Sequence, residues 1–233
     1  NPLNNNNYYK VKSLITSDKI NKPMFGFEQE FFLMRNNDTN PSLVSEYPVG
    51  FVYDKTIHQD KMQYYCSNGT SNVFYRNFIN KVYDCGIKSG LLLSGVNSEV
   101  AIGQWEIQVG PIEGVEACHQ LWLLRFLLIR IAEDYNINIS FHPKPLDNWN
   151  GSGLHTNYSN EKMRSNNKET YNYILNYIKE LEKTHKFAMD KYGVDNELRM
   201  TGGCETADFN KFSYGVADRG SSIRIPRNVY LNK

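Results

Sequence analysis

The sequence predicts an α+β protein, in which strands of antiparallel character are separated by long helices. Polar and apolar side chains alternate along residues 104–109, and residues 25–34 set two glutamates among phenylalanines, as in strands with one buried face. Residues 72–85 and 113–135 carry apolar side chains at helical spacing. A doubly wound parallel sheet is less favoured, because the elements follow one another without a repeat.

The remaining elements are expected in chain order as follows. Residues 8–22 form a connector with a short helix, and the polar residues 35–63 form a long loop or a hairpin. The helix over 72–85 stops at Gly86, since glycine is typical of a helix C-cap. Further strands are expected at 91–100, 138–142, 154–158 and 223–225, and a further helix at 168–192.

The helix over 113–135 is the richest in apolar side chains. Its stripe of leucines, with Trp122 and Phe126, is predicted to lie in the core rather than against a cofactor. Arg125 and Arg130 are predicted to lie on its solvated or paired edge.

The composition is that of a globular protein without a strong charge bias. At 233 residues and 40% hydrophobic content, the chain is long enough to bury a sizeable core. Lys and Arg number 26 against 25 Asp and Glu, so no overall field favours nucleic acid or an anionic membrane. The sequence has neither an apolar run of membrane-spanning length nor a secretion signal pattern. We therefore expect no nucleic-acid and no membrane partner.

The four cysteines show no metal-binding or redox spacing. Cys85 and Cys118 fall in helix-like runs, where cysteine behaves as a small apolar residue. We expect all four, including Cys66 and Cys204, to be reduced thiols of a cytoplasmic protein.

Two glutamates share one face of the first predicted strand. Side chains alternate along a strand, so Glu28 and Glu30 point one way while Phe27 and Phe31 point into the opposite layer. Carboxylates in apolar surroundings are unfavourable unless positive charge neutralises them, and a metal ion is the simplest neutraliser. The alternative is that each glutamate is an exposed residue at the edge of a sheet, which is the usual situation of a single glutamate in a strand.

The same pattern recurs in a second strand and near a histidine. Glu106 lies between Gln104 and Gln108 on one face, opposite a face of apolar side chains, and Glu99 comes just before that strand. His155 follows a glycine-rich stretch, which indicates close approach of the backbone to a ligand. The alternative is a structural histidine. Together these residues indicate a metal cluster.

Four arginines fall within about thirty residues of the C-terminal segment. They are Arg199, Arg219, Arg224 and Arg227. Arginine suits bidentate binding of phosphate or carboxylate, although each one alone also fits a surface ion pair. With an acidic cluster they indicate a nucleotide site in which metals and guanidinium groups share the phosphoryl charge. The sequence contains neither the P-loop nor the dinucleotide-binding glycine motif.

Four segments carry these residues: GFEQEFFLM, NSEVAIGQWEIQVGP, FHPKP with NWNGSGLHTNYS, and TGGCETADFNKFSYGVADRGSSIRIPR. In order and spacing they resemble the catalytic domain of eukaryotic-type glutamine synthetase, from about Met24 to Arg227. The resemblance implies an antiparallel sheet curved around the site and flanked by helices, in a ring-shaped homo-oligomer. Residues 1–22 would then be a connector and residues 23–233 the catalytic domain.

The resemblance also implies a set of site residues. The first metal site maps to Glu30, Glu99 and Glu106, and the second to Glu28 and His155, with Mg²⁺ or Mn²⁺ as the ions. The glutamate cradle maps to Asn148, Trp149, Asn150 and Gly151, with Arg199 and Arg219. Nucleotide contacts map to Glu106, Asn157, Ser159, Arg219 and Arg224, and the catalytic residues to Glu205, Arg199 and Arg219.

The implied reaction joins ammonia to the side-chain carboxylate of L-glutamate at the expense of ATP, through γ-glutamyl phosphate, to give glutamine. Glu205 would deprotonate ammonium and shield the intermediate, with Gly202 and Gly203 as a hinge.

The sequence also departs from the family pattern. Cys204 and Met24 replace residues usual at those positions, and residues 35–63 lack the family's Gly- and Pro-rich loop. The N-terminal β-grasp domain, a further metal carboxylate and a further substrate arginine are not found, so weak activity of this chain by itself is expected. Two alternatives stay open: a non-catalytic structural or interaction protein that kept the fold, and a related γ-glutamyl ligase acting on a larger amine.

Overall fold

The computed structural model describes residues 2–17, 21–36, 44–51, 68–69, 73–147, 149–165, 167–203 and 206–232. The chain divides into two compact units, Asn1–Tyr158 and Ser159–Lys233. The boundary expected at residue 22, with one domain after it, stays a prediction. None of the described helices combines the length and the apolar character needed to cross a membrane.

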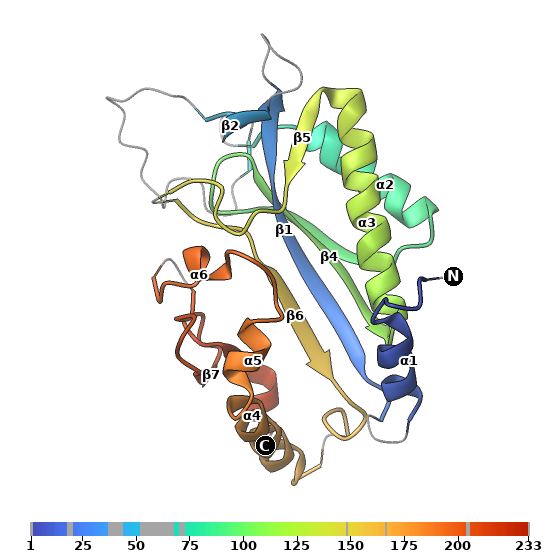
Figure 1. The fold of residues 1–233 in the computed structure, drawn as a ribbon, viewed down its shortest axis with the longest axis vertical. Helices are drawn as coiled ribbons and strands as arrows, with labels where there is room; N and C mark the ends of the chain where they lie inside the picture. Colours follow the sequence, from blue (N-terminus) through green and yellow to red (C-terminus); the bar gives the residue numbers. More distant parts are fainter. Residues whose placement is uncertain are drawn as a thin grey trace. The chain divides into compact units, whose positions relative to one another are not determined.

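The first unit is built on a sheet with the order β2-β1-β4-β3, in which β5 and β6 also pair with β1. The strands are β1 (Met24–Asn36), β2 (Val44–Pro48), β3 (Leu93–Ser98), β4 (Gln104–Glu113), β5 (Ile137–Ser140) and β6 (Leu154–Ser159). The long strand β1 runs through the middle of this sheet (Figure 1). It pairs antiparallel with β2, β4 and β5, and β3 pairs antiparallel with β4. The predicted antiparallel sheet is confirmed.

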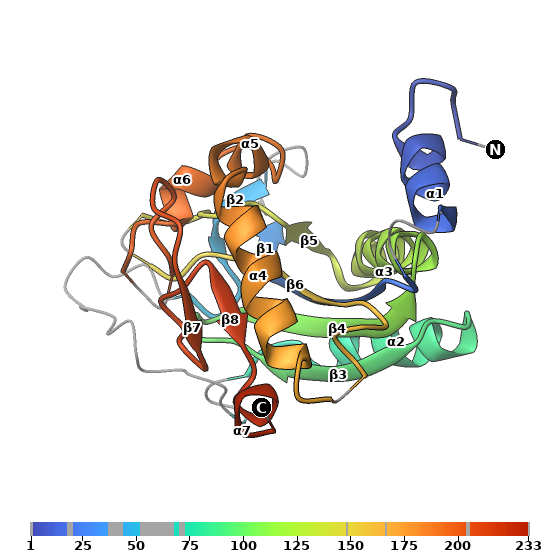
Figure 2. The ribbon, with the colours of Figure 1, turned by 90° about the horizontal axis from the view of Figure 1, so that it is seen from below.

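Three α-helices accompany this sheet: α1 (Tyr8–Thr16), α2 (Arg76–Lys88) and α3 (Glu116–Ala132), which a 3₁₀ turn at Glu133–Tyr135 follows. Helices α2 and α3 pack on one face, where Phe78 and Leu124 join Phe31 and Trp105 in a single apolar core. Helix α1 lies beside α3 (Figure 2), and the ring of Tyr8 stacks on that of His119 with centroids 5.5 Å apart. The other face of the sheet is left for the polar side chains of β1 and β4.

Helix α2 does not stop at Gly86, so that prediction is wrong. The helix continues to Lys88, and Gly86 is buried within it. A Cβ atom at Gly86 would lie 2.8 Å from Cδ1 of Leu93, inside the closest approach of two carbon atoms. Glycine therefore serves here to let α2 approach β3, and not to end the helix.

The aromatic stripe of α3 is not in the core, so that prediction is also wrong. Trp122 is 68% exposed and Phe126 is 60% exposed, whereas Leu121, Leu124 and Leu128 are buried. The leucines follow one another at three and four residues and cover the sheet. Trp122 and Phe126 lie one helical row away, where the Arg125 guanidinium stands 5.5 Å from the Trp122 ring centroid.

Residues 35–63 are in part a hairpin, because β2 pairs with the end of β1. The rest of that stretch falls largely outside the described residues.

The second unit contains short elements: α4 (Thr170–Glu182), α5 (His185–Met189), α6 (Asn196–Arg199), β7 (Tyr214–Val216), β8 (Ile223–Ile225) and α7 (Arg227–Leu231). The single helix predicted over 168–192 is therefore wrong. It is interrupted at Thr184, whose backbone leaves the helical region and whose hydroxyl donates to the Leu181 carbonyl oxygen. The predicted strand at 223–225 is confirmed and pairs in parallel with β7.

Candidate metal centre

Strands β1 and β4 bring three carboxylates, those of Glu28, Glu30 and Glu106, onto the face of the sheet opposite the helices. Glu30 lies directly across from Glu106 in the strand register. Glu99 joins them through the turn between β3 and β4, where its N–H donates to the Gln104 carbonyl oxygen at 3.0 Å. Ligand atoms of Glu30, Glu99 and Glu106 all lie within 4.8 Å of one another. The register of β1 with β4 and the turn between β3 and β4 thus produce a carboxylate triad.

A second group shares one member with this triad. Ligand atoms of Glu28, Glu106 and His155 also lie within 4.8 Å of one another. His155 stands on β6, with Nδ1 at 3.2 Å from Glu28 Oε2 and 3.8 Å from Glu30 Oε1. The sequence placed Glu28 and His155 together, and the structure adds Glu106 as the residue common to both groups.

The triad brings three carboxylates together in partly buried surroundings. Burial, and then the neighbouring carboxylates of Glu30 and Glu106, raise the pKa of Glu99 from 4.5 to about 7. Burial is also the main cause that raises the pKa of Glu106. A bound divalent cation would relieve both effects.

Neutral amide groups surround the carboxylates. Asn157 Nδ2 donates to Glu28 Oε1 at 2.9 Å, and Asn97 Nδ2 donates to Glu99 Oε1 at 3.0 Å. Gln108 Nε2 donates to Glu106 Oε1 at 2.5 Å and to Asn97 Oδ1 at 3.1 Å. These bonds orient the carboxylates without adding positive charge to the site. Asn97 was not predicted as part of the site, because its position opposite Glu106 depends on the pairing of β3 with β4.

The loop before β6 is tied to the triad. Gly153 N–H donates to Glu30 Oε2 at 2.7 Å, and Gln104 Nε2 donates to the Gly151 carbonyl oxygen at 3.0 Å. Trp149 is buried in a small cluster with Phe32 and Met34. This loop carries the residues expected to bind glutamate, of which Asn148 lies outside the described residues.

A family model described as "Glutamine synthetase, catalytic domain" matches residues 8–172 of this chain. The chain belongs to the glutamine synthetase family. Glutamine synthetase of Schizosaccharomyces pombe is 49% identical over 170 residues, which is 72% of this chain and 47% of that protein. Glutamine synthetase of Suillus bovinus is 42% identical over 229 residues, 98% of this chain and 62% of that protein. The chain thus spans about 62% of the length of such a relative.

A solved structure supports the fold. The cryo-EM structure of Plasmodium falciparum glutamine synthetase matches with a TM-score of 0.74 and 18% identity, over 94% of this chain and 47% of that one.

The four arginines of the C-terminal segment of this glutamine synthetase family member lie in its second unit. Arg199 ends α6, Arg224 stands on β8, and Arg219 lies in the connection between β7 and β8. Asp218 organises that connection. Its carboxylate accepts from Gly220 N–H at 3.0 Å and from Ser221 Oγ at 2.6 Å, and its carbonyl oxygen accepts from Arg224 Nε at 3.3 Å. The bonds from Ser221 and Gly220 lower the pKa of Asp218.

The family resemblance also implies roles for Ser159 and Glu205. Ser159 accepts a hydrogen bond on Oγ from Arg164 Nη1 at 2.9 Å. Glu205 and its neighbour Cys204 lie outside the described residues, so the assignment of Glu205 as the catalytic acid–base residue stays a prediction.

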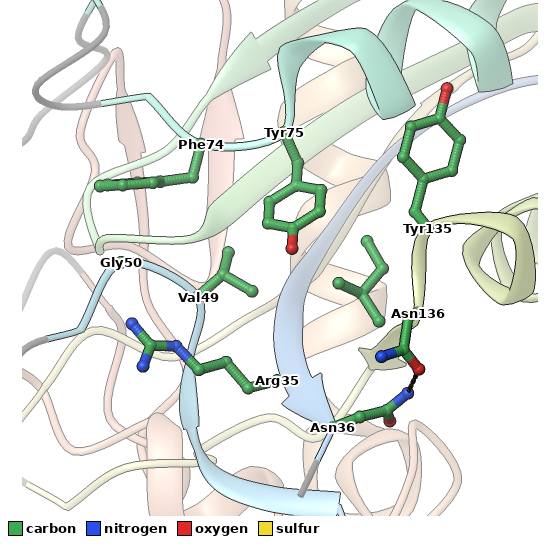
Figure 3. Close-up of a pocket in the computed structure, with 9 residues that line it drawn as sticks. Arg35, Asn36, Val49, Gly50, Phe74, Tyr75, Tyr135 and Asn136 are labelled. Atoms are coloured by element: carbon green, nitrogen blue, oxygen red, sulfur yellow. Dashed lines mark hydrogen bonds between the residues drawn. The ribbon is translucent and has the colours of Figure 1, made fainter. Parts of the chain in front are cut away.

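A separate hollow of about 380 Å³ lies at the C-terminal end of β1, beside Arg35 and Asn36 (Figure 3). Its lining includes Arg35, and also Tyr75 and Asn136, both of which have a positive φ. The other described residues of its lining are Asn36, Val49, Gly50, Phe74, Tyr135 and Ile137. None of these nine is acidic, so this hollow lacks the carboxylate chemistry of the triad.

Proposed function

We propose that the protein catalyses the ATP-dependent ligation of ammonia to the side-chain carboxylate of L-glutamate, giving glutamine through γ-glutamyl phosphate. The observation that carries this proposal is the pair of ligand groups, Glu30–Glu99–Glu106 and Glu28–Glu106–His155, joined through Glu106. Two cation sites that share one carboxylate suit the binding of a nucleoside triphosphate and the transfer of its terminal phosphoryl group.

The donor atoms fit divalent cations of the expected kind. The triad offers carboxylate oxygens alone, which suits Mg²⁺, and the imidazole of His155 makes the second group suited to Mn²⁺. The raised pKa of Glu99 supports the same conclusion, because it reflects a buried carboxylate with two further carboxylates, Glu30 and Glu106, beside it. Cations bound here would supply positive charge to the transferring phosphoryl group.

The protein's own side chains would do the remaining work. Arg219 and Arg224 would bind phosphate oxygens, with Asn157 and Ser159 as further nucleotide contacts. Arg199, with the loop from Asn148 to Gly151, would hold the glutamate carboxylate in line for attack. Glu205 would accept a proton from ammonium and exclude water from the acyl phosphate. We further propose a cytoplasmic homo-oligomer, in keeping with the family resemblance.

The test is an assay of purified protein with ATP, glutamate and hydroxylamine in the presence of Mg²⁺ or Mn²⁺. We expect γ-glutamyl hydroxamate and phosphate to form in equal amounts. Glu106→Gln should abolish both products, because Glu106 belongs to both ligand groups. The matched control is Glu182→Gln, which removes an exposed carboxylate on α4 and should leave the rate unchanged.

Binding of Mn²⁺ and ATP without any hydroxamate would contradict the proposal. It would favour the alternative of a structural or interaction protein that keeps the fold.

A further inference from the structure

Glu30 lies where the partner of β1 changes from one strand to another. Strand β5 pairs with β1 from Phe32 to Arg35, and Glu30 N–H donates to the Gly153 carbonyl oxygen at 3.1 Å, just before β6. Gly26 lies beside Asn157, while Glu28 meets His155, so β6 runs antiparallel to β1 (Figure 1).

The backbone at this junction departs from an ordinary antiparallel pair. Two facing residues of the hydrogen-bonded kind exchange both of their N–H···O bonds. Here Gly153 N–H donates instead to Oε2 of the Glu30 side chain, at 2.7 Å. The Gly153 N–H, which would otherwise complete the backbone pair, thus binds the carboxylate of Glu30, a proposed metal ligand.

The carbonyl oxygen of Glu30 receives its hydrogen bond from the other face of the sheet. Gln29 Nε2 donates to it at 2.7 Å, and the Gln29 side chain, 2% exposed, lies in the layer covered by α3. A buried carbonyl needs such a partner. Gln29 Oε1 in turn accepts from Arg125 Nε at 2.7 Å.

Arg125 is itself held in place on α3. Its guanidinium carbon lies 5.0 Å from the ring centroid of Phe141 and 5.5 Å from that of Trp122. Burial lowers the pKa of Arg125. The guanidinium therefore fixes the orientation of the Gln29 amide. Its oxygen must face Arg125 to accept a hydrogen bond, so its NH₂ group faces the Glu30 carbonyl oxygen and donates to it.

We propose that Gln29 and Arg125 are positioning residues for the Glu30 carboxylate. They satisfy the Glu30 carbonyl oxygen from the helix-covered face, which leaves Gly153 N–H to hold Oε2 from the loop. With Oε2 fixed, Oε1 is directed toward the side of His155. The inference rests on the proposed metal-dependent function, which assigns a role to the orientation of Glu30, and it adds two residues that lie outside both ligand groups.

The experiment compares Gln29→Met with Leu128→Val in the complete chain. Methionine retains the length of glutamine and removes its donor and acceptor, whereas Leu128 is a fully buried residue of the same core and makes no polar contact. Three quantities are measured: the Mn²⁺ dissociation constant by electron paramagnetic resonance, the melting temperature, and the amide resonance of Gly153 in metal-free, ¹⁵N-labelled protein.

We expect Gln29→Met to weaken Mn²⁺ binding roughly tenfold, as loss of a residue that orients a ligand does. The Gly153 amide proton should shift upfield, because its N–H returns from a charged carboxylate to the Glu30 carbonyl. Leu128→Val should lower the melting temperature while leaving the Mn²⁺ affinity and the Gly153 resonance unchanged. Arg125→Met should act like Gln29→Met, and Arg125→Lys, which restores a donor, should recover part of the affinity.

An unchanged Gly153 resonance in Gln29→Met, or in Arg125→Met if the first variant does not fold, would overturn the proposal. So would equal losses of Mn²⁺ affinity in Gln29→Met and Leu128→Val. The Gly153 measurement needs no metal, so it decides the positioning role even if the parent protein binds no Mn²⁺, a result that would instead contradict the proposed function.

Discussion

Glu30 and Glu106 face each other directly across the antiparallel strands β1 and β4, and both are 6% exposed. Like charges at directly opposed positions destabilise a sheet, and burial strengthens that effect. The core face beneath them is well packed, since Phe31 and Trp105 occupy the next register pair and are almost fully buried. The sheet therefore holds together two carboxylates that a bound divalent cation would stabilise.

The shared position of Glu106 predicts different metal stoichiometries for two variants. Glu28 belongs to one ligand group and Glu106 to both. Glu28→Gln should weaken one Mn²⁺ site and spare the other, whereas Glu106→Gln should weaken both by at least about tenfold. A Mn²⁺ titration followed by electron paramagnetic resonance measures this. Equal stoichiometry in the two variants would show that the groups do not act as separate sites.

Anomalous scattering gives an independent check. Crystals soaked with Mn²⁺ should show a peak between Glu30, Glu99 and Glu106 within about 2.5 Å of the carboxylate oxygens, as oxygen ligation requires. A peak elsewhere, with the triad bound only to solvent, would rule out this site.

Gly86→Ala should destabilise the protein although it replaces glycine inside a helix. The added methyl group would meet Cδ1 of Leu93 at 2.8 Å. We expect overpacking to lower the free energy of unfolding by about 1–3 kcal/mol, which outweighs the gain of up to about 1 kcal/mol in helix propensity. Urea denaturation measures the difference, with the exposed Asn80→Ala as the control. The double variant Gly86→Ala, Leu93→Val should recover part of the loss.

The sequence predicted the parts of the site that depend on local geometry. Glu28 and Glu30 share a face because side chains alternate along any strand, and the same holds for Glu106 between its two glutamines. Both expectations needed only the residues of one strand. The α+β class was predictable for the same reason, since each element carries its own periodicity.

What the sequence did not reveal depends on contacts between elements. Whether Gly86 ends a helix or lets it approach a strand is decided by Leu93, which comes from β3. Trp122 and Phe126 fit an apolar stripe, but only the position of the sheet determines that the leucine row beside them is the buried one. Asn97 became visible as a site residue through the register of β3 with β4.

Glu205 is predicted to matter for chemistry and not for stability, because it lies in a Gly- and polar-rich segment with few apolar neighbours in the sequence. Glu205→Ala should reduce the rate of hydroxamate formation by about 10²–10⁴-fold, the usual loss for an acid–base residue. The melting temperature and ATP affinity should stay unchanged. Lost ATP affinity with normal turnover in the surviving fraction would identify a structural residue instead.

The raised pKa of Glu99 predicts an unusual pH dependence of stability. In the metal-free folded protein this carboxyl group keeps its proton up to about pH 7, whereas in the unfolded chain it ionises near 4.5. Between these values the folded state binds more protons than the unfolded state. The free energy of unfolding should therefore fall as the pH rises from about 4.5 to 7, by up to about 3 kcal/mol from this group, and then level off.

Urea denaturation of chelator-treated protein between pH 5 and 8 measures this slope. Glu99→Gln should flatten it, because the amide does not titrate, while the exposed Glu182→Gln should retain the slope of the parent protein. Saturating Mn²⁺ should reverse the trend. The cation binds the ionised carboxylate, and at low pH the proton competes with it more strongly, so Mn²⁺ stabilises the folded protein less there. If Glu99→Gln and the parent protein keep the same slope, Glu99 is ionised throughout and the triad has another source of positive charge.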